Sequence, residues 1–257
     1  MVDMALKSER RQIPIEVFGL ENLKGHAIGA VSAASATNEL TLRFGFAGQN
    51  GEHHMKILDT TTAPNPRRVR IFLAEKGLSV PFEPFEMNMT NLRSEEFTAM
   101  NPMQRVPILV LDDGTCISES VAICRYFEEL HPEPPLFGTG ALGKALVEMW
   151  NRRMELNFFT AVGQAFRHLH PNMREREVTQ VAEWGEANKA KCLGALKILD
   201  DQLANTQYVA GENYSIADIT GLVAVDFMKV ARIDMPDTLS NVQRWYNEVS
   251  ARPSAKA

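Results

Sequence analysis

The residues best suited to hold a small charged ligand are Glu119 and Ser120, which lie side by side before an apolar segment. That segment has helical periodicity and predicts a helix that begins near Ser120. A helix N-terminus carries unpaired N–H groups and partial positive charge, so it attracts a carboxylate. Ser120 adds a hydroxyl donor, and Glu119 supplies an anion for an ammonium group. Together they fit the head group of an α-amino acid; the alternative is a helix cap that binds no ligand.

A second candidate is the Val106–Pro107 pair, which precedes the apolar run Ile108–Leu111. Proline has no amide hydrogen, so it suits the first position of a strand rather than its centre. A bend there would leave the N–H and C=O of Val106 at a sheet edge, where an extended peptide could pair with them. A cis Val106–Pro107 bond would turn the backbone outward. The alternative is an ordinary proline that opens a strand.

The elements that must position these residues begin with a hairpin. Asp113-Gly114 favours a tight turn, and Thr115–Ile117 follows as the return strand. Upstream, the pattern predicts a strand at 56–58, a loop at 60–66, a helix from near Pro66 to Lys76-Gly77, an edge strand at 81–87 and a helix near 94–100. The order β-α-β-α-β-β-α predicts a three-layer α/β arrangement.

Residues 131–135 (HPEPP) form the clearest linker, and the chain after them has helical periodicity. One helix is expected from about Val178 to Leu203. Ser215 and Asp218 have the spacing of a capping box, with Asp in place of Glu or Gln. This box should open a buried helix, Ile219–Val230.

Composition limits the class of protein. The chain has 257 residues, 45% of them hydrophobic and 23% charged, which is ordinary for a globular protein. A net charge of −5 argues against nucleic acid as the main partner. Without a run of about 18 apolar residues, we expect no membrane span. Three widely spaced cysteines indicate a reducing, cytoplasmic compartment, and the His53-His54 pair lacks spaced partners, so we expect no metal site.

The stretch from Asn101 to Leu130 resembles the glutathione-binding half of the cytosolic glutathione transferases. The shared pattern is Asn101-Pro102, Val106-Pro107, Asp113-Gly114 and Glu119-Ser120. The resemblance extends from about residue 55 to the C-terminus. It implies a thioredoxin-like α/β glutathione-binding domain at 55–136 and an all-α helical domain at 137–257. Residues 1–54 are then an extension, disordered or not part of the core fold.

The resemblance also implies a function. Such a protein conjugates the glutathione thiolate to small hydrophobic electrophiles, as in detoxification, and forms a homodimer. Val106 would pair with the cysteinyl backbone of glutathione, and Glu119 and Ser120 would hold the γ-glutamyl group. Gln104 and Arg105 could reach a glutathione carboxylate. The electrophile pocket would be lined by residues of the first C-terminal helix, although most could equally be bundle core: Trp150, Arg153, Met154, Asn157 and Phe158.

The catalytic residue departs from the family pattern. A Tyr, Ser or Cys in the loop after the first strand usually activates the glutathione sulfur, but Ala63 lies at the aligned position here. We predict Asn65 first and Thr62 second as the thiolate-stabilising group. The neighbouring Arg67 and Arg68 are expected to be a solvated pair, the alternative being contact with a glutathione carboxylate or a partner-subunit acid.

Two other functions compete with conjugation. One is a glutathione-dependent disulfide reductase, which the absence of a loop cysteine permits. The other is a non-catalytic binding protein that kept the fold, which Ala63 favours.

Overall fold

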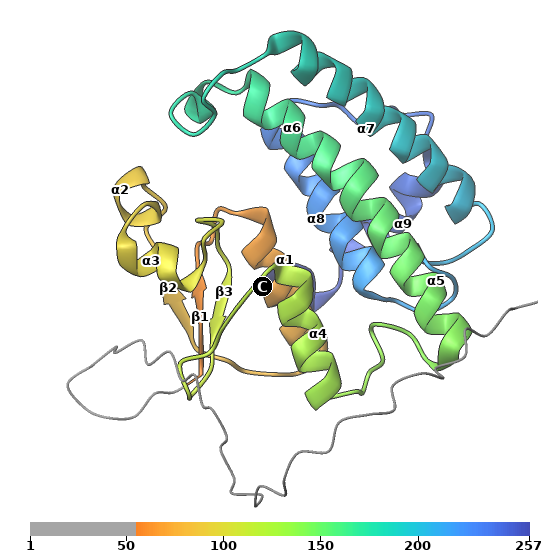
Figure 1. Ribbon diagram of the computed structural model, residues 1–257. Helices are drawn as coiled ribbons and strands as arrows, with labels where there is room; N and C mark the ends of the chain where they lie inside the picture. The colour runs from red at the N-terminus through yellow and green to blue at the C-terminus, as the bar shows by residue number, and fades with distance from the viewer. Residues whose placement is uncertain (1–54) are drawn as a thin grey trace, which may run out of the picture. The chain divides into compact units, whose positions relative to one another are not determined.

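The computed structural model describes residues 55–257; the predicted extension at 1–54 lies outside the described residues. Four strands form one sheet in the order β2-β1-β3-β4 (Figure 1). They are β1 (Lys56–Asp59), β2 (Phe82–Pro84), β3 (Ile108–Val110) and β4 (Cys116–Ser118). β1 and β2 are parallel because helix α1 (Pro64–Glu75) connects them, whereas β1–β3 and β3–β4 are antiparallel.

Helices cover both faces of the sheet because side chains alternate along each strand. Ile57 and Leu109 belong to the cluster that includes α1 and α4 (Ser120–Leu130). Leu58 and Ile108 pack on the other face with Phe97. That face is covered by α2 (Met89–Leu92) and α3 (Glu95–Met100) (Figure 1). The three-layer α/β prediction is confirmed, with α2 as an additional short helix that the sequence pattern did not predict.

The rest of the chain is helical. Its elements are α5 (Gly140–Arg152), the π-helix η1 (Arg153–Phe159), α6 (Thr160–Leu169), η2 (Pro171–Met173), α7 (Ala182–Leu203), α8 (Ile216–Val230), α9 (Ser240–Ser250) and η3 (Pro253–Lys256). α5, η1 and α6 follow one another without a break, and α7 packs along α6 (Figure 1). The all-helical prediction is confirmed, but α7 begins later than the expected Val178. The exact division between domains near residue 136 stays a prediction.

The buried helix α8 begins at the predicted capping box. Ser215 and Asp218 exchange both bonds of the box. The Asp218 carboxylate, fully buried, also accepts hydrogen bonds of 2.9 Å from the Val209 N–H and from Trp245 Nε1. Burial raises the pKa of Asp218 to about 6. This network joins the start of α8 to α9 and fixes the helical bundle.

The linker is held by a buried lysine at the end of α1. Lys76 Nζ lies 2.5 Å from Glu128 Oε2 and donates to the His131 carbonyl at 2.8 Å. Gly77 follows with φ of 65°, as expected for a glycine after a helix end. Across residues 55–257, no helix is both long and apolar enough to cross a membrane.

Candidate functional site

Three segments leave the sheet at the same end. Leu58 in β1 and Ser118 in β4 both lie opposite Ile108, the first residue of β3. Because both pairings are antiparallel, the loop after β1, the residues before β3 and the residues after β4 meet there. The structure thus brings the Val106–Pro107 pair close to the start of α4 and to the loop before α1.

The segment before β3 has a fixed shape. The Val106–Pro107 bond is cis, the isomer considered from the sequence, and Val106 is buried. The Asn101 side chain, 2% exposed, donates to the Arg105 carbonyl at 2.8 Å and accepts from the Met103 N–H at 3.0 Å. Asn101 therefore orients the turn that presents Arg105, whose side chain is exposed, and Val106.

Gln104 lies in the same turn with a positive φ of 54°. Its Nε2 donates to Thr98 Oγ1 at 3.1 Å. One N–H of its side-chain amide is thus used to hold α3, and the second N–H can still donate a hydrogen bond. A contact between Gln104 or Arg105 and a glutathione carboxylate stays a prediction.

Glu119 has an unusual backbone. Its φ is 69° and its ψ is 112°, a region that residues with a Cβ rarely adopt, and its side chain is exposed. It occupies the N-cap position of α4, yet its carboxylate makes no capping hydrogen bond. The alternative of a capping role is therefore not supported. Strain of this kind persists where surrounding structure imposes it, and it is common at binding sites.

Ser120 is 5% exposed, and its Oγ accepts a hydrogen bond of 3.0 Å from Arg68 Nη1. The same nitrogen lies 2.9 Å from Glu155 Oε1 in η1. Arg68 is 1% exposed, so the expectation of a solvated arginine pair is wrong. Arg67 is also paired, at 2.6 Å from Asp226. Sequence reasoning missed this because the packing of α1 against the helical domain has no local signal.

The start of α1 lacks a capping side chain. The helix begins at Pro64, slightly before the predicted start near Pro66, and its N-cap is Ala63. Because both prolines lack an amide hydrogen, the Asn65 N–H is the first main-chain donor of α1. The Asn65 side chain is half-buried and Thr62 is exposed. Their roles toward a thiolate stay predictions.

The loop before α1 is held by one arginine. Arg70 Nη1 lies 2.8 Å and 2.7 Å from the two carboxylate oxygens of Asp59, at the end of β1. Its Nη2 also donates to the Thr61 carbonyl at 3.4 Å. This pairing places the loop that carries Thr62 against the end of the sheet.

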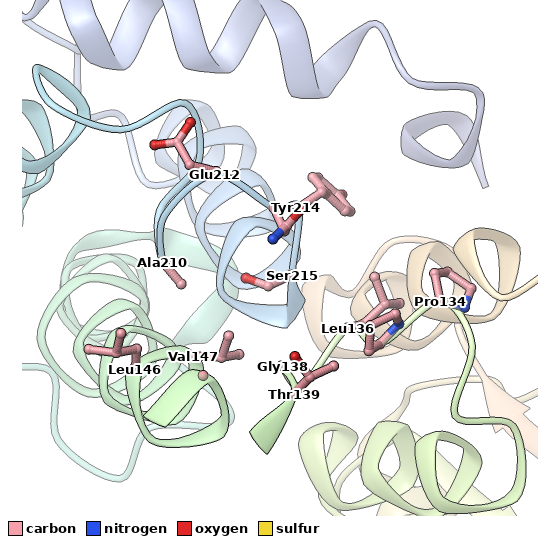
Figure 2. A pocket seen from close by; sticks show the side chains of 13 residues that line it. Pro134, Leu136, Gly138, Thr139, Leu146, Val147, Ala210, Glu212, Tyr214 and Ser215 are labelled. Atoms are coloured by element: carbon pink, nitrogen blue, oxygen red, sulfur yellow. The ribbon is translucent and has the colours of Figure 1, made fainter. Parts of the chain in front are cut away.

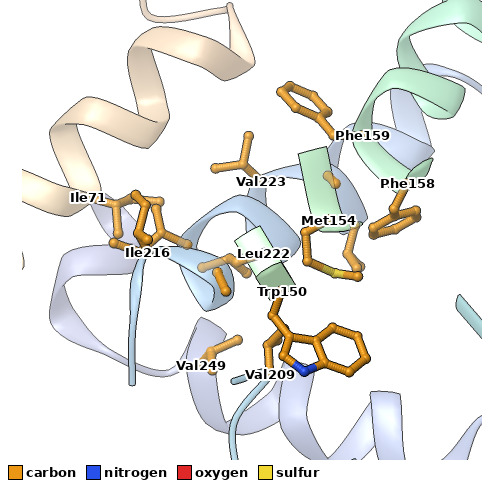
Figure 3. Close-up of a cluster of buried hydrophobic side chains, with 14 of the residues drawn as sticks. Ile71, Trp150, Met154, Phe158, Phe159, Val209, Ile216, Leu222, Val223 and Val249 are labelled. Atoms are coloured by element: carbon orange, nitrogen blue, oxygen red, sulfur yellow. The ribbon is translucent and has the colours of Figure 1, made fainter. Parts of the chain in front are cut away.

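The predicted electrophile residues fall into two groups. Trp150, Met154 and Phe158 are 6%, 2% and 0% exposed, and Figure 3 shows them inside the buried cluster. They belong to the bundle core, which is the alternative stated for them, and they expose almost no surface. Arg153 and Asn157 lie on the exposed face of η1, with Arg153 Cζ 4.6 Å from the Trp150 ring. A ligand contact of these two stays a prediction.

A different set of aromatic side chains adjoins Arg68, the partner of Ser120. Phe159 and Phe166 both pack against Phe227 of α8, with ring centroids 6.2 Å and 5.1 Å apart. The Phe159 ring centroid is 5.1 Å from Arg68 Cζ. We call Phe159, Phe166 and Phe227 the aromatic cluster. Sequence analysis missed it as a group because η1, α6 and α8 each supply one ring; only the spacing of Phe159 and Phe166 gives a hint.

None of the protein thiols is activated. Burial raises the pKa of both Cys124 and Cys192 to about 12, and it also raises the pKa of Cys116. All three cysteines are free. In the part of the chain that the structure describes, no three or more His, Cys, Asp or Glu side chains come together in a group that could hold a metal ion.

A cavity of about 340 Å³ lies elsewhere, between the linker, the start of α5 and the loop before α8 (Figure 2). Its walls include Leu136, Thr139, Val147 and Ser215. No predicted site residue lines it, so it is separate from the end of the sheet where Glu119 and Ser120 lie.

Comparison with known proteins agrees with this geometry. The family model for the glutathione S-transferase N-terminal domain matches residues 58–135, and that for the glutathione S-transferase C-terminal domain matches residues 149–253. Glutathione S-transferase 2 of Saccharomyces cerevisiae is 37% identical over 219 residues, which cover 82% of this chain and 94% of the relative.

Solved structures give the same result. Gtt2 from Saccharomyces cerevisiae has a TM-score of 0.75 at 37% identity, covering 78% of this chain and 98% of that one. A glutathione S-transferase domain-containing protein from Marinobacter aquaeolei has a TM-score of 0.73 at 38% identity, covering 77% and 98%. The arrangement of sheet and helices is therefore shared along nearly the whole length of these proteins.

Proposed function

Since this chain belongs to the glutathione S-transferase family and is a transferase, we propose that it conjugates glutathione to a small hydrophobic electrophile. The observation that carries this proposal is the meeting of cis Val106–Pro107 with strained Glu119 and buried Ser120 at one end of the sheet. A peptide edge, an anion and a hydroxyl donor lie together there, and glutathione has a matching group for each.

Glutathione is held in three places. The main-chain N–H and C=O of Val106 pair with the cysteinyl residue as an added strand. The Glu119 carboxylate receives the γ-glutamyl ammonium, and the Ser120 hydroxyl donates to the α-carboxylate. Arg105, exposed beside Val106, is placed to receive the second carboxylate of glutathione, with Gln104 next to it.

The thiolate is stabilised at the start of α1. The Asn65 side chain and N–H are the first donors there, and Thr62 is a second candidate in the preceding loop. Donors and partial positive charge favour the ionised thiol and so raise the reactive fraction at neutral pH. The thiol proton passes to solvent, the sulfur forms a bond to the electrophilic carbon, and the leaving group departs with the electron pair.

The electrophile lies against the aromatic cluster, because Phe159 borders Arg68 and Phe166 and Phe227 are half-buried rather than fully packed. An apolar wall of this kind suits small hydrophobic ligands. Arg153 and Asn157 remain candidate polar contacts. We also place the protein in the cytoplasm, where its three free cysteines would stay reduced.

A homodimer is part of the proposal. Three exposed apolar side chains follow helical spacing along α5, Leu142 (72% exposed), Leu146 (40%) and Met149 (37%), and Leu156 (52%) lies further along in η1. Exposed apolar side chains on one face of a helix are typical of an interface. A monomer in sedimentation equilibrium at micromolar protein would contradict this part.

Disulfide reduction by bound glutathione is the second candidate, favoured by the absence of an activated protein thiol. There the glutathione thiolate would attack one sulfur of a mixed disulfide, forming a new disulfide with it, and the other sulfur would leave as a thiolate that takes a proton from solvent. A second glutathione thiolate would then attack the sulfur of the first glutathione, forming glutathione disulfide and releasing the remaining half of the substrate as a thiol. Comparing turnover of a mixed disulfide with turnover of an aryl halide separates the two reactions.

Titration calorimetry with reduced and oxidised glutathione tests the proposal, using the parent and Glu119→Ala. We expect micromolar to millimolar binding of reduced glutathione, weakened at least about tenfold in Glu119→Ala, because a charge-assisted hydrogen bond is lost. Preference for the oxidised form would favour the disulfide reductase. No binding of either form by the folded parent would leave only a non-catalytic binding protein.

A further inference from the structure

Arg68 is a buried cation between Ser120 and the aromatic cluster. It is 1% exposed, and one nitrogen, Nη1, serves two acceptors: Ser120 Oγ at 3.0 Å and Glu155 Oε1 at 2.9 Å. Ser120 is 5% exposed, whereas the Glu155 side chain is 24% exposed. A buried arginine needs such partners, since an unpaired buried charge is costly.

The pairing has a consequence for the Ser120 hydroxyl. A guanidinium has only donors, so Ser120 Oγ must be the acceptor of this hydrogen bond. The hydroxyl hydrogen is then left to donate to another group, and no described residue accepts it. Ser120 lies at the first position of α4 beside a positive guanidinium. A carboxylate is the acceptor that this combination of donor, helix terminus and cation favours.

The arrangement is not the one that stability alone would select. Arg68 Nε and Nη2 are buried and have no hydrogen-bond partner among the described residues. Leaving two donors of a buried cation unsatisfied costs stability, and the Phe159 ring, 5.1 Å from Cζ, compensates for only part of it. The geometry thus keeps a cation at Ser120 even though two of its donors stay unpaired.

We propose that Arg68 is a positioning residue, which holds the Ser120 hydroxyl as a donor to the α-carboxylate of the γ-glutamyl group. Glu155 of η1, in the helical domain, holds Arg68 in place. The helical domain therefore helps to orient Ser120, the residue of the sheet domain that binds the carboxylate. The inference rests on the proposed binding of glutathione by Ser120.

The test compares ligands with and without that carboxylate. The pair is S-hexylglutathione and S-hexyl-γ-aminobutyryl-cysteinylglycine, whose common apolar chain raises the affinity of both. In Arg68→Met we expect a loss of about 10- to 100-fold in affinity for the first ligand and little change for the second. Ser120→Ala should show the same selectivity, and the double variant should lose little more, because both changes remove one interaction.

Conservative changes sharpen the result. Arg68→Lys keeps the charge and one donor but cannot reproduce the planar guanidinium, so we expect partial recovery of affinity for the carboxylate ligand only. Glu155→Gln keeps the size of the side chain and removes the charge that holds Arg68. Glu155→Gln should lower the affinity for the carboxylate ligand by a smaller factor than Arg68→Met does. It serves as the test if Arg68→Met does not fold.

Arg67→Met is the matched control. Arg67 is the neighbouring arginine of α1 and also joins the helical domain, through Asp226 at 2.6 Å and the Ala255 carbonyl at 3.0 Å. It makes no hydrogen bond to Ser120. Its loss should lower stability without changing the ratio of affinities for the two ligands.

Two results would overturn the inference. In the first, Arg68→Met and Glu155→Gln lower the affinity for both ligands equally, which would indicate a purely structural role. In the second, both affinities stay unchanged. If the parent binds glutathione and Ser120→Ala alone shows the selectivity, only the role of Arg68 fails. If the folded parent binds no glutathione at all, the proposed function itself fails.

Discussion

The end of the sheet and the buried face of η1 were both expected to bind ligand, but they differ in how their side chains are packed. At the end of the sheet, Val106 and Glu119 converge from segments next to the paired strands β3 and β4. In η1, Met154 and Phe158 are 2% and 0% exposed and fill the core. Turns and helix ends have sequence motifs a few residues long, so a candidate site made of them can be recognised from the sequence. An apolar position in a helix has the same spacing whether it contacts a ligand or a neighbouring helix.

The largest expected effect tests whether the buried face of η1 belongs to the core. Phe158→Ala removes a fully buried ring, so we expect a loss of about 3–5 kcal/mol in the free energy of unfolding. Urea unfolding measures it, and KM for glutathione should stay within about twofold of the parent in the folded variant. The adjacent Asn157→Ala is the control, because an exposed change should cost no more than about 0.5 kcal/mol. If Phe158→Ala instead raised KM for the electrophile and left stability unchanged, Phe158 would be a residue of the electrophile pocket.

A smaller effect separates strain from binding at Glu119. Its φ of 69° suits glycine, so Glu119→Gly should be more stable than Glu119→Ala by about 1 kcal/mol in thermal unfolding. Both variants lack the carboxylate and should bind glutathione equally weakly. If Glu119→Gly kept the affinity of the parent, the carboxylate would have no part in binding and only the backbone shape would matter.

The smallest effect concerns the thiols, which should stay unreactive. Because burial raises the pKa of Cys124 and Cys192 to about 12, a thiol reagent at pH 7 should label them only after unfolding. Cys116, half-buried with a raised pKa, should react slowly, at a rate that rises about tenfold per pH unit up to pH 9. Fast labelling of any of them at neutral pH would assign redox chemistry to the protein rather than to bound glutathione.

The sequence by itself determined the sheet domain and much of its site. Asp113-Gly114, Pro107 and the apolar period after Ser120 act over a few residues, so turn, strand and helix start follow from local chemistry. The capping box at Ser215 is local in the same sense, and both bonds form. Even Ala63 in place of a hydroxyl could be recognised from the sequence, and it occupies the N-cap of α1.

Only the tertiary structure decided which side chains meet across elements. Arg68 looked like part of a solvated pair, yet packing of α1 against η1 buries it and gives it Ser120 and Glu155 as partners. Phe159 and Phe227 come together from helices far apart in the chain. Helical periodicity gives the apolar face of a helix but not what covers it, because burial depends on long-range packing that no short segment encodes.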